Sequence, residues 1–262
     1  MDYQHLNLEH RGHIAYIHFN RPEKANALNH QHLTELEHAV LSFRDDAQTR
    51  VIIFTGRGKH FSSGADLTDP GEAYKVPLVL RRRRLRMGER AIEAILNTDQ
   101  LTIAAWHGAA MGGGACVATA CDFRIGTADC FMQYPEIDIG VNLMWKSLPL
   151  IVNLVGPARA KRLVAGGERI HASTLLAWGV LDELVAPEAL AEAADAMAAH
   201  YANKPPVAVQ MIKRSTNQIV NALNNAIMHM DTDQNIFAAG TDDRQQAITA
   251  YLNKETPTFS GN

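Results

Sequence analysis

The stretches FSSGADL at residues 61–67 and GAAMGGGACVATACD at residues 108–122 decide which fold this sequence predicts. Each comes after an apolar run typical of a buried strand, and the second passes into small apolar residues typical of a helix. The successive glycines at 112–114 leave backbone N–H groups uncovered by side chains, at the positive end of a helix dipole. Such a turn can bind an oxyanion, although a tight strand-to-helix crossover would use the same residues.

The glycines do not have the spacing of a nucleotide-binding motif. Gly56-Arg57-Gly58-Lys59-His60 lacks the serine or threonine that follows the lysine of a P-loop. Met111-Gly112-Gly113-Gly114 lacks both the G-x-G-x-x-G spacing and an acidic residue placed for a ribose. The sequence therefore predicts neither a P-loop nor a dinucleotide site.

Strand and helix patterns alternate along the chain and predict an α/β protein with a mostly parallel core. The expected strands are Ile14–Phe19, Val51–Thr55, Leu101–Trp106, Asp122–Ile125 and Phe131–Met132. One expected helix begins near Asn29. The others cover about 80–97, Gly114–Cys121, Ala158–Ala165, Ala172–Trp178 and Pro187–Asn203. Residues beyond Pro205-Pro206 also have helical composition, which predicts a separate docking region.

Both glycine stretches resemble motifs of the crotonase (enoyl-CoA hydratase/isomerase) superfamily, F-x-x-G-A-D and G-x-x-x-G-G-G…C-D. Further matches follow in the family's order at Asn20–Leu28, Glu136–Gly140 and, near the end, Thr241–Arg244 with Tyr251–Lys254. Motifs in one order are far more specific than any of them alone. The resemblance implies an α/β crotonase-like spiral of ββα turns over residues 1–200 and a C-terminal helical trimerisation region over 201–262. We therefore expect a homotrimer or a dimer of trimers.

The resemblance also implies an acyl-CoA thioester substrate and no cofactor or metal, because coenzyme A is part of the substrate. In that family the thioester oxygen accepts two backbone N–H bonds, which by position are those of Ala65 and Gly113. Preorganised donors there stabilise the charge that develops when a thioester enolises. The same match implies that the groove for the CoA nucleotide is lined by Lys24, Ala25, Ala27, Asp66 and Leu67. It also implies that Tyr251 and Lys254 contact the CoA bound to a neighbouring subunit. Asp66 would equally serve as a helix N-cap.

Hydratases of this family divide proton delivery and water activation between two glutamates, and this chain keeps one of them. The first position, two residues after the third glycine, holds Cys116, whereas the second holds Glu136. A lone carboxylate suits a shuttle that moves one proton from carbon 2 to carbon 4. The pattern is closest to that of Δ3,Δ2-enoyl-CoA isomerases, which resemble this chain in a small or apolar residue at the Cys116 position and in a pair like Trp145-Lys146. We expect Glu136 to be the catalytic acid/base, with Cys116 and Trp145 beside the substrate.

Other reactions that use the same oxyanion hole stay open, namely hydration, thioester hydrolysis and C–C cleavage. Asp138 could supplement Glu136 if the segment is extended. Cys116 is more typical of a buried helix residue than of a nucleophile, since no histidine lies within a helical turn of it. The run Arg81–Arg84 also admits a non-catalytic or RNA-binding member, although a basic helix face near solvent or an anionic ligand explains it better.

Composition is consistent with a soluble enzyme. The chain has 262 residues, 47% of them hydrophobic, and 28 acidic against 25 basic residues give a net charge of −3, a poor footprint for nucleic acid. Its three cysteines lack C-x-x-C spacing, which predicts neither disulfides nor a zinc site. No signal-like segment opens the sequence and no apolar run approaches a membrane span. We expect a cytoplasmic location, with no membrane and no nucleic-acid partner.

Overall fold

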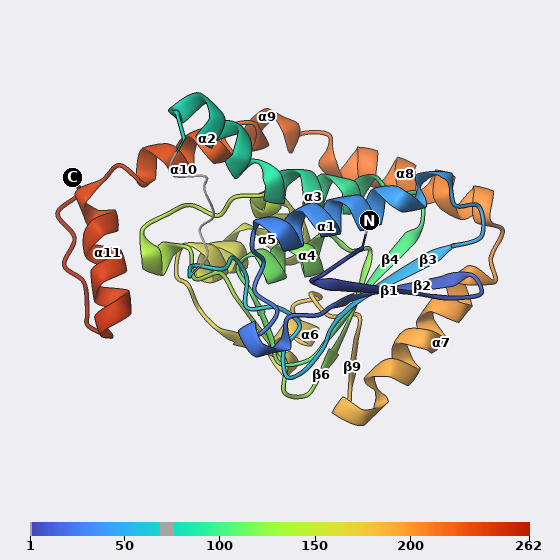
Figure 1. The fold of residues 1–262 in the computed structure, drawn as a ribbon. Helices are drawn as coiled ribbons and strands as arrows, with labels where there is room; N and C mark the ends of the chain where they lie inside the picture. Colours follow the sequence, from blue (N-terminus) through green and yellow to red (C-terminus); the bar gives the residue numbers. More distant parts are fainter. Residues whose placement is uncertain (1, 69–75) are drawn as a thin grey trace.

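A six-stranded sheet forms the centre of the computed structural model, which describes residues 2–68 and 76–262 (Figure 1). Its strand order is β1-β2-β3-β4-β6-β9, and every neighbouring pair is parallel except β1 with β2. A smaller sheet has the order β5-β7-β8. The strands are β1 (Leu6–Arg11), β2 (Ile14–Phe19), β3 (Val51–Gly56), β4 (Leu101–Trp106), β5 (Ala109–Met111), β6 (Phe123–Thr127), β7 (Phe131–Gln133), β8 (Ile170–His171) and β9 (Glu183–Val185). The expected α/β fold with a mostly parallel core is confirmed.

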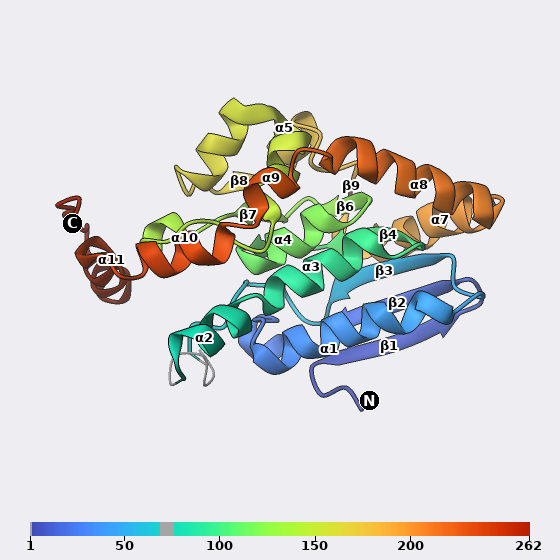
Figure 2. The same cartoon turned by 90° about the horizontal axis from the view of Figure 1, so that it is seen from above.

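Helices cover both faces of this sheet. On one face α1, α3 and α4 lie side by side, as Figure 2 shows, and α7 packs on the other. The α-helices are α1 (His30–Leu41), α2 (Leu78–Leu85), α3 (Met87–Asn97), α4 (Gly113–Ala120), α5 (Ser147–Val164), α6 (Ala172–Ala177), α7 (Leu190–Ala202), α8 (Pro206–Asn221), α9 (Asn225–Met228), α10 (Asp231–Ala238) and α11 (Asp242–Asn253). Short 3-10 helices are η1 (Pro22–Lys24), η2 (Ser42–Asp45), η4 (Ile137–Ile139) and η5 (Pro187–Ala189). None of the helices in the described ranges is long and apolar enough to cross a bilayer.

Alternating side chains of the central strands fill two separate cores. Ile52 and Phe54 of β3 point to the side of α1, α3 and α4, whereas Val51 and Ile53 point to α7, where small residues such as Ala194 allow close packing. All four β3 side chains are fully buried, as expected for a strand covered on both faces. The continuous apolar run at 51–55 therefore reflects burial on both sides of the sheet.

Successive turns of the chain stack against one another beside the large sheet. The Ser62 backbone N–H donates to the Ala109 carbonyl, and the Ser62 carbonyl accepts from the Met111 N–H, both at 3.0 Å. Ala109–Met111 pairs in turn with β7 in parallel register. On the other side Leu28 and Ala65 form a parallel bridge. This stacking brings residues near 28, 65, 111 and 133 to one edge of the molecule.

Several elements differ from the expectation, among them the short strands β5, β8 and β9, which were not expected. Strand β1 was not expected, because its sequence LNLEHR carries polar side chains; it pairs antiparallel with β2 through a turn at Gly12. The helix expected over about 80–97 is two helices, because Arg86 (ψ 7°) leaves the helical region. The expected helix Ala158–Ala165 is only the second half of α5, whose Gly156 (φ 77°, ψ 164°) kinks the chain before Pro157.

The C-terminal helices extend away from the sheet and then return to the body of the molecule. The expected division at residue 200 lies in the last turn of α7, and α8 begins at Pro206. Helix α11, at the left in Figure 1, packs on η4, the short helix that begins just after Glu136. The Arg244 guanidinium donates a 3.0 Å hydrogen bond to the Ile139 carbonyl and fixes this contact.

Candidate active site

The glycine turn between β5 and α4 makes room for three different neighbours. A Cβ on Gly112 would lie 2.8 Å from Glu136 Oε1, and one on Gly113 would lie 2.2 Å from the Trp145 ring. A Cβ on Gly114 would lie 2.6 Å from the Ser62 carbonyl oxygen. Gly112 also has φ 46° and ψ −120°, a conformation that L-residues with a Cβ avoid. Each of the three glycines is therefore required because a different neighbour lies too close for a Cβ. A tight strand-to-helix crossover alone would not require all three.

Two backbone N–H groups at this turn are available to a ligand. In the described part of the chain, neither the Ala65 N–H nor the Gly113 N–H donates to a protein acceptor. The two loops are close, since a Cβ on Gly64 would lie 3.2 Å from the Gly113 nitrogen. Gly113 is also the first residue of α4, where the helix dipole favours negative charge. The structure thus brings together the two N–H groups expected to form the oxyanion hole.

Glu136 lies at this hole as a buried carboxyl group. It follows Pro135 and immediately precedes η4, and its Oε2 is buried without a hydrogen-bond partner among the described residues. Burial raises the pKa of Glu136 to about 7, with a smaller contribution from the negative charge of Asp138. A carboxyl group with that pKa is both ionised and protonated in appreciable fractions near neutral pH, which suits a group that must accept and return a proton.

Glu136 and the glycine turn line a cavity of about 200 Å³. The lining residues are Ser63, Ala65, Leu67, Met111, Gly112, Gly113, Cys116, Pro135, Glu136, Ile139, Val141, Asn142, Leu143, Met144, Trp145, Asn235, Arg244 and Tyr251. Of these described lining residues, Glu136 alone carries a carboxylate. The volume is smaller than the roughly 300–1,000 Å³ of ordinary ligand pockets, which favours a short or slender group.

Cys116 lies in the cavity wall, as expected, and its thiol is not set up to act as a nucleophile. Its side chain is only 1% exposed, and burial raises the pKa of its thiol well above the ordinary range, with a further contribution from the charge of Glu136. A thiol held in its neutral form is a poor nucleophile. The residue therefore acts as an apolar wall at the position where hydratases were expected to have a glutamate.

Asp138 does not join Glu136. The segment after Glu136 is the 3-10 helix η4 rather than an extended strand, so the two side chains do not share a face. Asp138 instead approaches Gly167, where a Cβ would lie 3.1 Å from its Oδ1, and it is absent from the cavity lining. The extended geometry that would have brought it to the site does not occur.

The expected CoA-groove residues lie on two adjoining segments. Ser63 N–H donates to the Ala25 carbonyl at 2.9 Å, and Leu28 N–H donates to the Gly64 carbonyl at 2.7 Å. Lys24 and Leu67 are exposed, Ala25 is half-buried and Ala27 is buried. These contacts form a continuous edge that leads from Lys24 to the Ala65 N–H.

Asp66 has a structural role in this edge. Its carboxylate lies 3.1 Å from the Arg21 guanidinium and accepts hydrogen bonds from the Thr68 N–H and hydroxyl. These bonds hold the pKa of Asp66 below its usual range despite burial, which alone would raise it. Its partners thus include a buried arginine and a threonine turn, and a helix that began after Asp66 would extend into residues 69–75, outside the described ranges.

The C-terminal region contributes to the cavity of its own chain. Tyr251, on α11, lines the cavity, as do Arg244 and Asn235. Lys254 ends α11 in a left-handed conformation and is exposed away from the lining. Neither Asn235 nor Arg244 was among the expected site residues, although Arg244 lies in the matched stretch Thr241–Arg244, because their position depends on how α10 and α11 fold back. Contact of Tyr251 and Lys254 with a neighbouring subunit stays a prediction.

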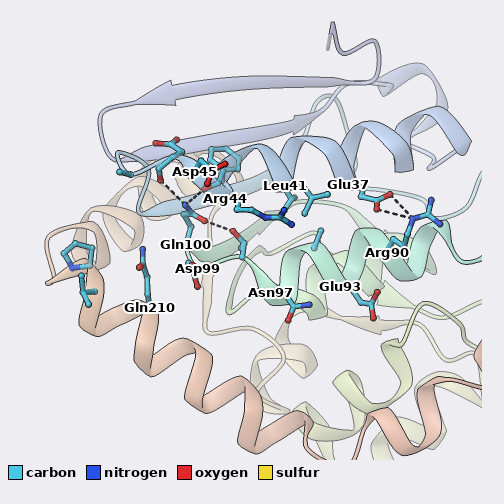
Figure 3. Close-up of a pocket in the computed structure, with 18 residues that line it drawn as sticks. Glu37, Leu41, Arg44, Asp45, Arg90, Glu93, Asn97, Asp99, Gln100 and Gln210 are labelled. Carbon is cyan, nitrogen blue, oxygen red and sulfur yellow. Dashed lines mark hydrogen bonds and ion pairs between the residues drawn. The ribbon is translucent and has the colours of Figure 1, made fainter.

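A larger hollow lies elsewhere and contains none of the expected site residues. It has a volume of about 630 Å³ and lies between α1, α3 and the start of α8 (Figure 3). Two of its charged groups, Arg90 and Glu37, form an ion pair at 3.1 Å. Among its described lining residues none has a carboxyl group whose pKa is raised as that of Glu136 is, since the one resolved shift there, at Asp46, lowers the pKa.

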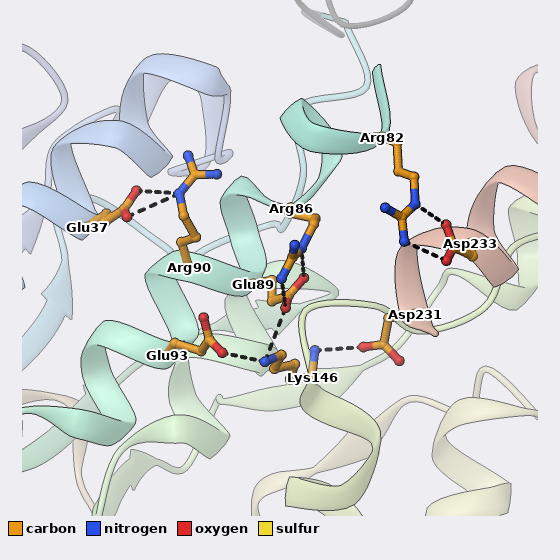
Figure 4. Close-up of polar contacts among 9 residues, drawn as sticks. All are labelled: Glu37, Arg82, Arg86, Glu89, Arg90, Glu93, Lys146, Asp231 and Asp233. Carbon is orange, nitrogen blue, oxygen red and sulfur yellow. Dashed lines mark hydrogen bonds and ion pairs between the residues drawn. The ribbon is translucent and has the colours of Figure 1, made fainter. Parts of the chain in front are cut away.

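Arginines of α2 and α3, and Arg86 between these helices, are bound to carboxylates within the chain (Figure 4). Arg82 donates two hydrogen bonds to Asp233 on α10, and Arg86 donates two to Glu89. Arg83 is on the same helix turn as Arg82. The basic run thus serves in part to attach α2 to the C-terminal region.

Comparison with known proteins shows which family the chain belongs to. A family described as enoyl-CoA hydratase/isomerase matches residues 9–262. The chain is 29% identical over 260 residues to a crotonyl-CoA hydratase of Syntrophomonas wolfei, with 99% of each chain covered. It is 32% identical over 250 residues to a probable enoyl-CoA hydratase of Mycobacterium tuberculosis, with 95% of this chain and 96% of the other covered.

Solved structures show the same fold. An enoyl-CoA hydratase/isomerase from Xanthobacter autotrophicus Py2 aligns with a TM-score of 0.87 and 28% identity, over 96% of this chain and 94% of that one. An enoyl-CoA hydratase from Mycobacterium avium subsp. paratuberculosis aligns with a TM-score of 0.88 at 22% identity, over 99% of this chain. The expected crotonase-like α/β fold is confirmed, and the chain belongs to the enoyl-CoA hydratase/isomerase family.

Proposed function

We propose that this enzyme converts 3-enoyl-CoA to 2-enoyl-CoA with Glu136 as a single proton shuttle. The observation that carries the proposal is that Glu136 is the one carboxylate among the described residues lining the cavity, beside the free Ala65 and Gly113 N–H groups. Isomerisation needs one group that takes and returns a proton, whereas hydration also needs a water molecule to be held and activated.

The reaction follows from these three groups. The thioester carbonyl oxygen accepts hydrogen bonds from the Ala65 and Gly113 N–H groups, and ionised Glu136 removes a proton from carbon 2. The electron pair of that C–H bond moves toward the carbonyl oxygen and gives a dienolate, whose charge the two donors and the start of α4 stabilise. Protonated Glu136 then delivers the proton to carbon 4, the double bond forms between carbons 2 and 3, and no atom is gained or lost.

The CoA part of the substrate is assigned to the edge formed by residues 24–28 and 62–67. The supporting observation is the backbone pairing of these segments, which runs from the exposed Lys24 to the Ala65 N–H. We also assign the assembly to a homotrimer or a dimer of trimers, because α8 exposes apolar side chains that include Ile219 (78%). Such side chains on a helix surface are typical of a subunit contact.

Hydration of 2-enoyl-CoA is the second candidate, because the curated relatives described above are hydratases by name. A water molecule would need an acceptor besides Glu136, and the cavity offers the Asn142 Oδ1, which is buried without a hydrogen-bond partner among the described residues. A neutral amide activates water less well than a carboxylate does. Isomerisation therefore remains the better-supported reaction.

Product analysis separates the two reactions. Purified protein is incubated with 3-hexenoyl-CoA and, separately, with 2-hexenoyl-CoA, and the acyl products are identified by mass spectrometry and chromatography. We expect 2-hexenoyl-CoA from the first substrate and little 3-hydroxyhexanoyl-CoA from the second. Rapid addition of water to 2-hexenoyl-CoA without isomerisation would reverse the assignment, while release of free CoA would indicate thioester hydrolysis.

A further inference from the structure

Trp145 and Lys146 have an unusual backbone conformation at the edge of the cavity. Both have positive φ values, 63° and 57°, although neither is glycine. Residues with a Cβ avoid this left-handed region, and two in succession need support from elsewhere in the molecule. The pair lies between the cavity residue Met144 and the start of α5, so the support decides where the Trp145 side chain points.

The Trp145 indole fills the space that two glycines leave open. A Cβ on Gly88 of α3 would lie 1.9 Å from the ring, and one on Gly113 would lie 2.2 Å from it. The side chain is only 9% exposed and lines the cavity next to the oxyanion hole. The indole is therefore a wall shared by α3, the start of α4 and the acyl cavity.

Lys146 is held by a cluster of carboxylates from two other elements (Figure 4). Its ammonium group lies 3.1 Å from Glu89 Oε1 and also contacts Glu93, both on α3. Its backbone N–H donates a 2.8 Å hydrogen bond to Asp231 Oδ2 at the start of α10. Arg86 neutralises the second oxygen of Glu89. The backbone bond to Asp231 and the two ion pairs together fix the left-handed pair.

Two charged groups of this cluster are largely buried, whereas an ion pair that only attaches a surface loop can stay in water. The Glu89 side chain is 6% exposed and that of Lys146 is 13% exposed, so both charges have lost most of their water. Removing one partner of such a pair is strongly destabilising because the other charge stays buried. Replacing both partners with well-packed apolar residues, in contrast, is often neutral or stabilising for the fold. A buried pair kept at this position therefore points to control of conformation.

We propose that the Lys146 cluster of Glu89, Glu93, Asp231 and Lys146 is a positioning device that holds the Trp145 indole as the end wall of the acyl cavity. The size of the acyl group that the enzyme accepts is thereby set by an ion-pair cluster outside the cavity. Because Asp231 belongs to α10, the position of the C-terminal region is linked to acyl selectivity. This inference rests on the proposed acyl-CoA function of the same cavity.

Binding of saturated acyl-CoAs tests the proposal without requiring catalysis. Dissociation constants for butyryl-CoA, hexanoyl-CoA and dodecanoyl-CoA are measured by calorimetry on wild type, Trp145→Ala, Lys146→Met and the control Lys161→Met, an exposed lysine of α5. In parallel, KM and kcat are measured with the corresponding 3-enoyl-CoAs. We expect Trp145→Ala and Lys146→Met to improve dodecanoyl-CoA binding relative to butyryl-CoA by about tenfold or more, the effect of one or two methylenes in a tight pocket. Lys161→Met should leave the profile unchanged.

The outcomes separate the two proposals. Wild-type protein that binds none of the acyl-CoAs refutes the proposed function. Binding by Lys146→Met with the wild-type length profile refutes the positioning role, even if the variant melts at a lower temperature. If Lys146→Met does not fold, Glu93→Gln provides the test, because this side chain is 39% exposed and its loss leaves the Glu89 pair in place. An unchanged profile in Glu93→Gln together with a widened one in Trp145→Ala would make the wall independent of the cluster and overturn the inference.

Discussion

The Cα of Gly112 lies directly against the carboxyl group of Glu136, so that a Cβ there would come within 2.8 Å of Oε1. The same glycine has φ 46° and ψ −120°, and its N–H donates to the Gln133 carbonyl at 2.9 Å. The chain before Glu136 is thus anchored to the turn that presents the Gly113 N–H. The proposed base and the proposed oxyanion hole are therefore positioned by one backbone contact, the bond from Gly112 N–H to the Gln133 carbonyl.

Gly112→Ala should therefore lose both activity and stability. The new methyl group meets Glu136 and needs a backbone conformation that costs on the order of 1–3 kcal/mol. Gly12→Ala is the matched control, because Gly12 also has a positive φ (62°) but has no heavy atom within 4 Å of its Cβ position. Thermal unfolding should show a loss in both variants, and turnover of 3-enoyl-CoA should fall only in Gly112→Ala. Full activity of Gly112→Ala would argue against the contact.

Glu136→Gln should abolish isomerisation while acyl-CoA binding persists. The amide keeps the shape of the side chain but cannot accept and return a proton, and losses of about 10²–10⁴-fold in kcat are typical when an acid/base is removed. Asp138→Asn is the matched control, because Asp138 lies outside the cavity lining. Steady-state rates and acyl-CoA dissociation constants check both variants. Activity of Glu136→Gln within tenfold of wild type would remove Glu136 from its role.

The rate should depend on pH through the ionisation of Glu136. Since the pKa of Glu136 is raised to about 7 by burial, the ionised base is scarce at pH 5. We expect kcat/KM to rise about tenfold per pH unit below pH 7 and then level off, because only ionised Glu136 can take the carbon 2 proton. A profile that is flat from pH 5 to pH 8 would contradict a buried carboxyl base.

Unfolding measurements provide a test of the same pKa that does not depend on activity. The folded state holds the Glu136 proton more tightly than the unfolded state does, where the pKa is near 4.5. The contribution of protonated Glu136 to the free energy of unfolding is therefore fully present below about pH 4.5. It is lost as the pH rises through about 7, which lowers the free energy of unfolding by roughly 3 kcal/mol. Wild type should lose stability relative to Glu136→Gln over this range and not above it.

The position of the proposed catalytic groups around one cavity could be predicted from sequence because these groups lie in short motifs with fixed backbone roles. Ala65 and Gly113 each follow a glycine of a recognisable turn, and Glu136 follows a proline at the expected distance from it. Such local patterns encode where a backbone N–H points. The parallel strands were predictable for a similar reason, since burial on both faces produces continuous apolar runs such as Val51–Thr55.

The remaining features depend on contacts between distant parts of the chain. Strand β1 has a mixed polar sequence and exists because β2 offers an edge for pairing. Trp145 was expected near the substrate, but its contact with Gly88 requires knowing that α3 passes the start of α4. Arg244 reaches the cavity because α11 returns to η4, and Asn235 reaches it because α10 is bound to Asn142 and Lys146 through Asp231. A local sequence pattern does not indicate which distant segments of the chain will come into contact.

A trimeric assembly is expected from the C-terminal helices. Ile219 and Leu223 are 78% and 81% exposed at the end of α8 and just beyond it, and burying such side chains stabilises a complex by about 25 cal/mol per Å² of apolar surface. Light scattering should give a mass three or six times that of the 28.8 kDa chain at micromolar concentration. The double variant Ile219→Glu with Leu223→Glu should shift the mass toward the monomer. A monomeric wild-type protein would contradict the expectation.

Cys116 is the residue on which the choice between isomerase and hydratase depends. It is buried in the cavity wall at the position where family hydratases were expected to supply a second glutamate. Cys116→Glu should therefore introduce hydration of 2-enoyl-CoA, because the new carboxylate can hold and activate a water molecule. The added negative charge should also raise the pKa of Glu136 further, since like charges oppose ionisation, and move the rising limb of the pH profile upward. Cys116→Gln controls for the added volume and should not hydrate. Wild-type protein that hydrates 2-enoyl-CoA near the ordinary enzyme rate of about 10 per second would show that one carboxylate suffices and would refute the isomerase assignment.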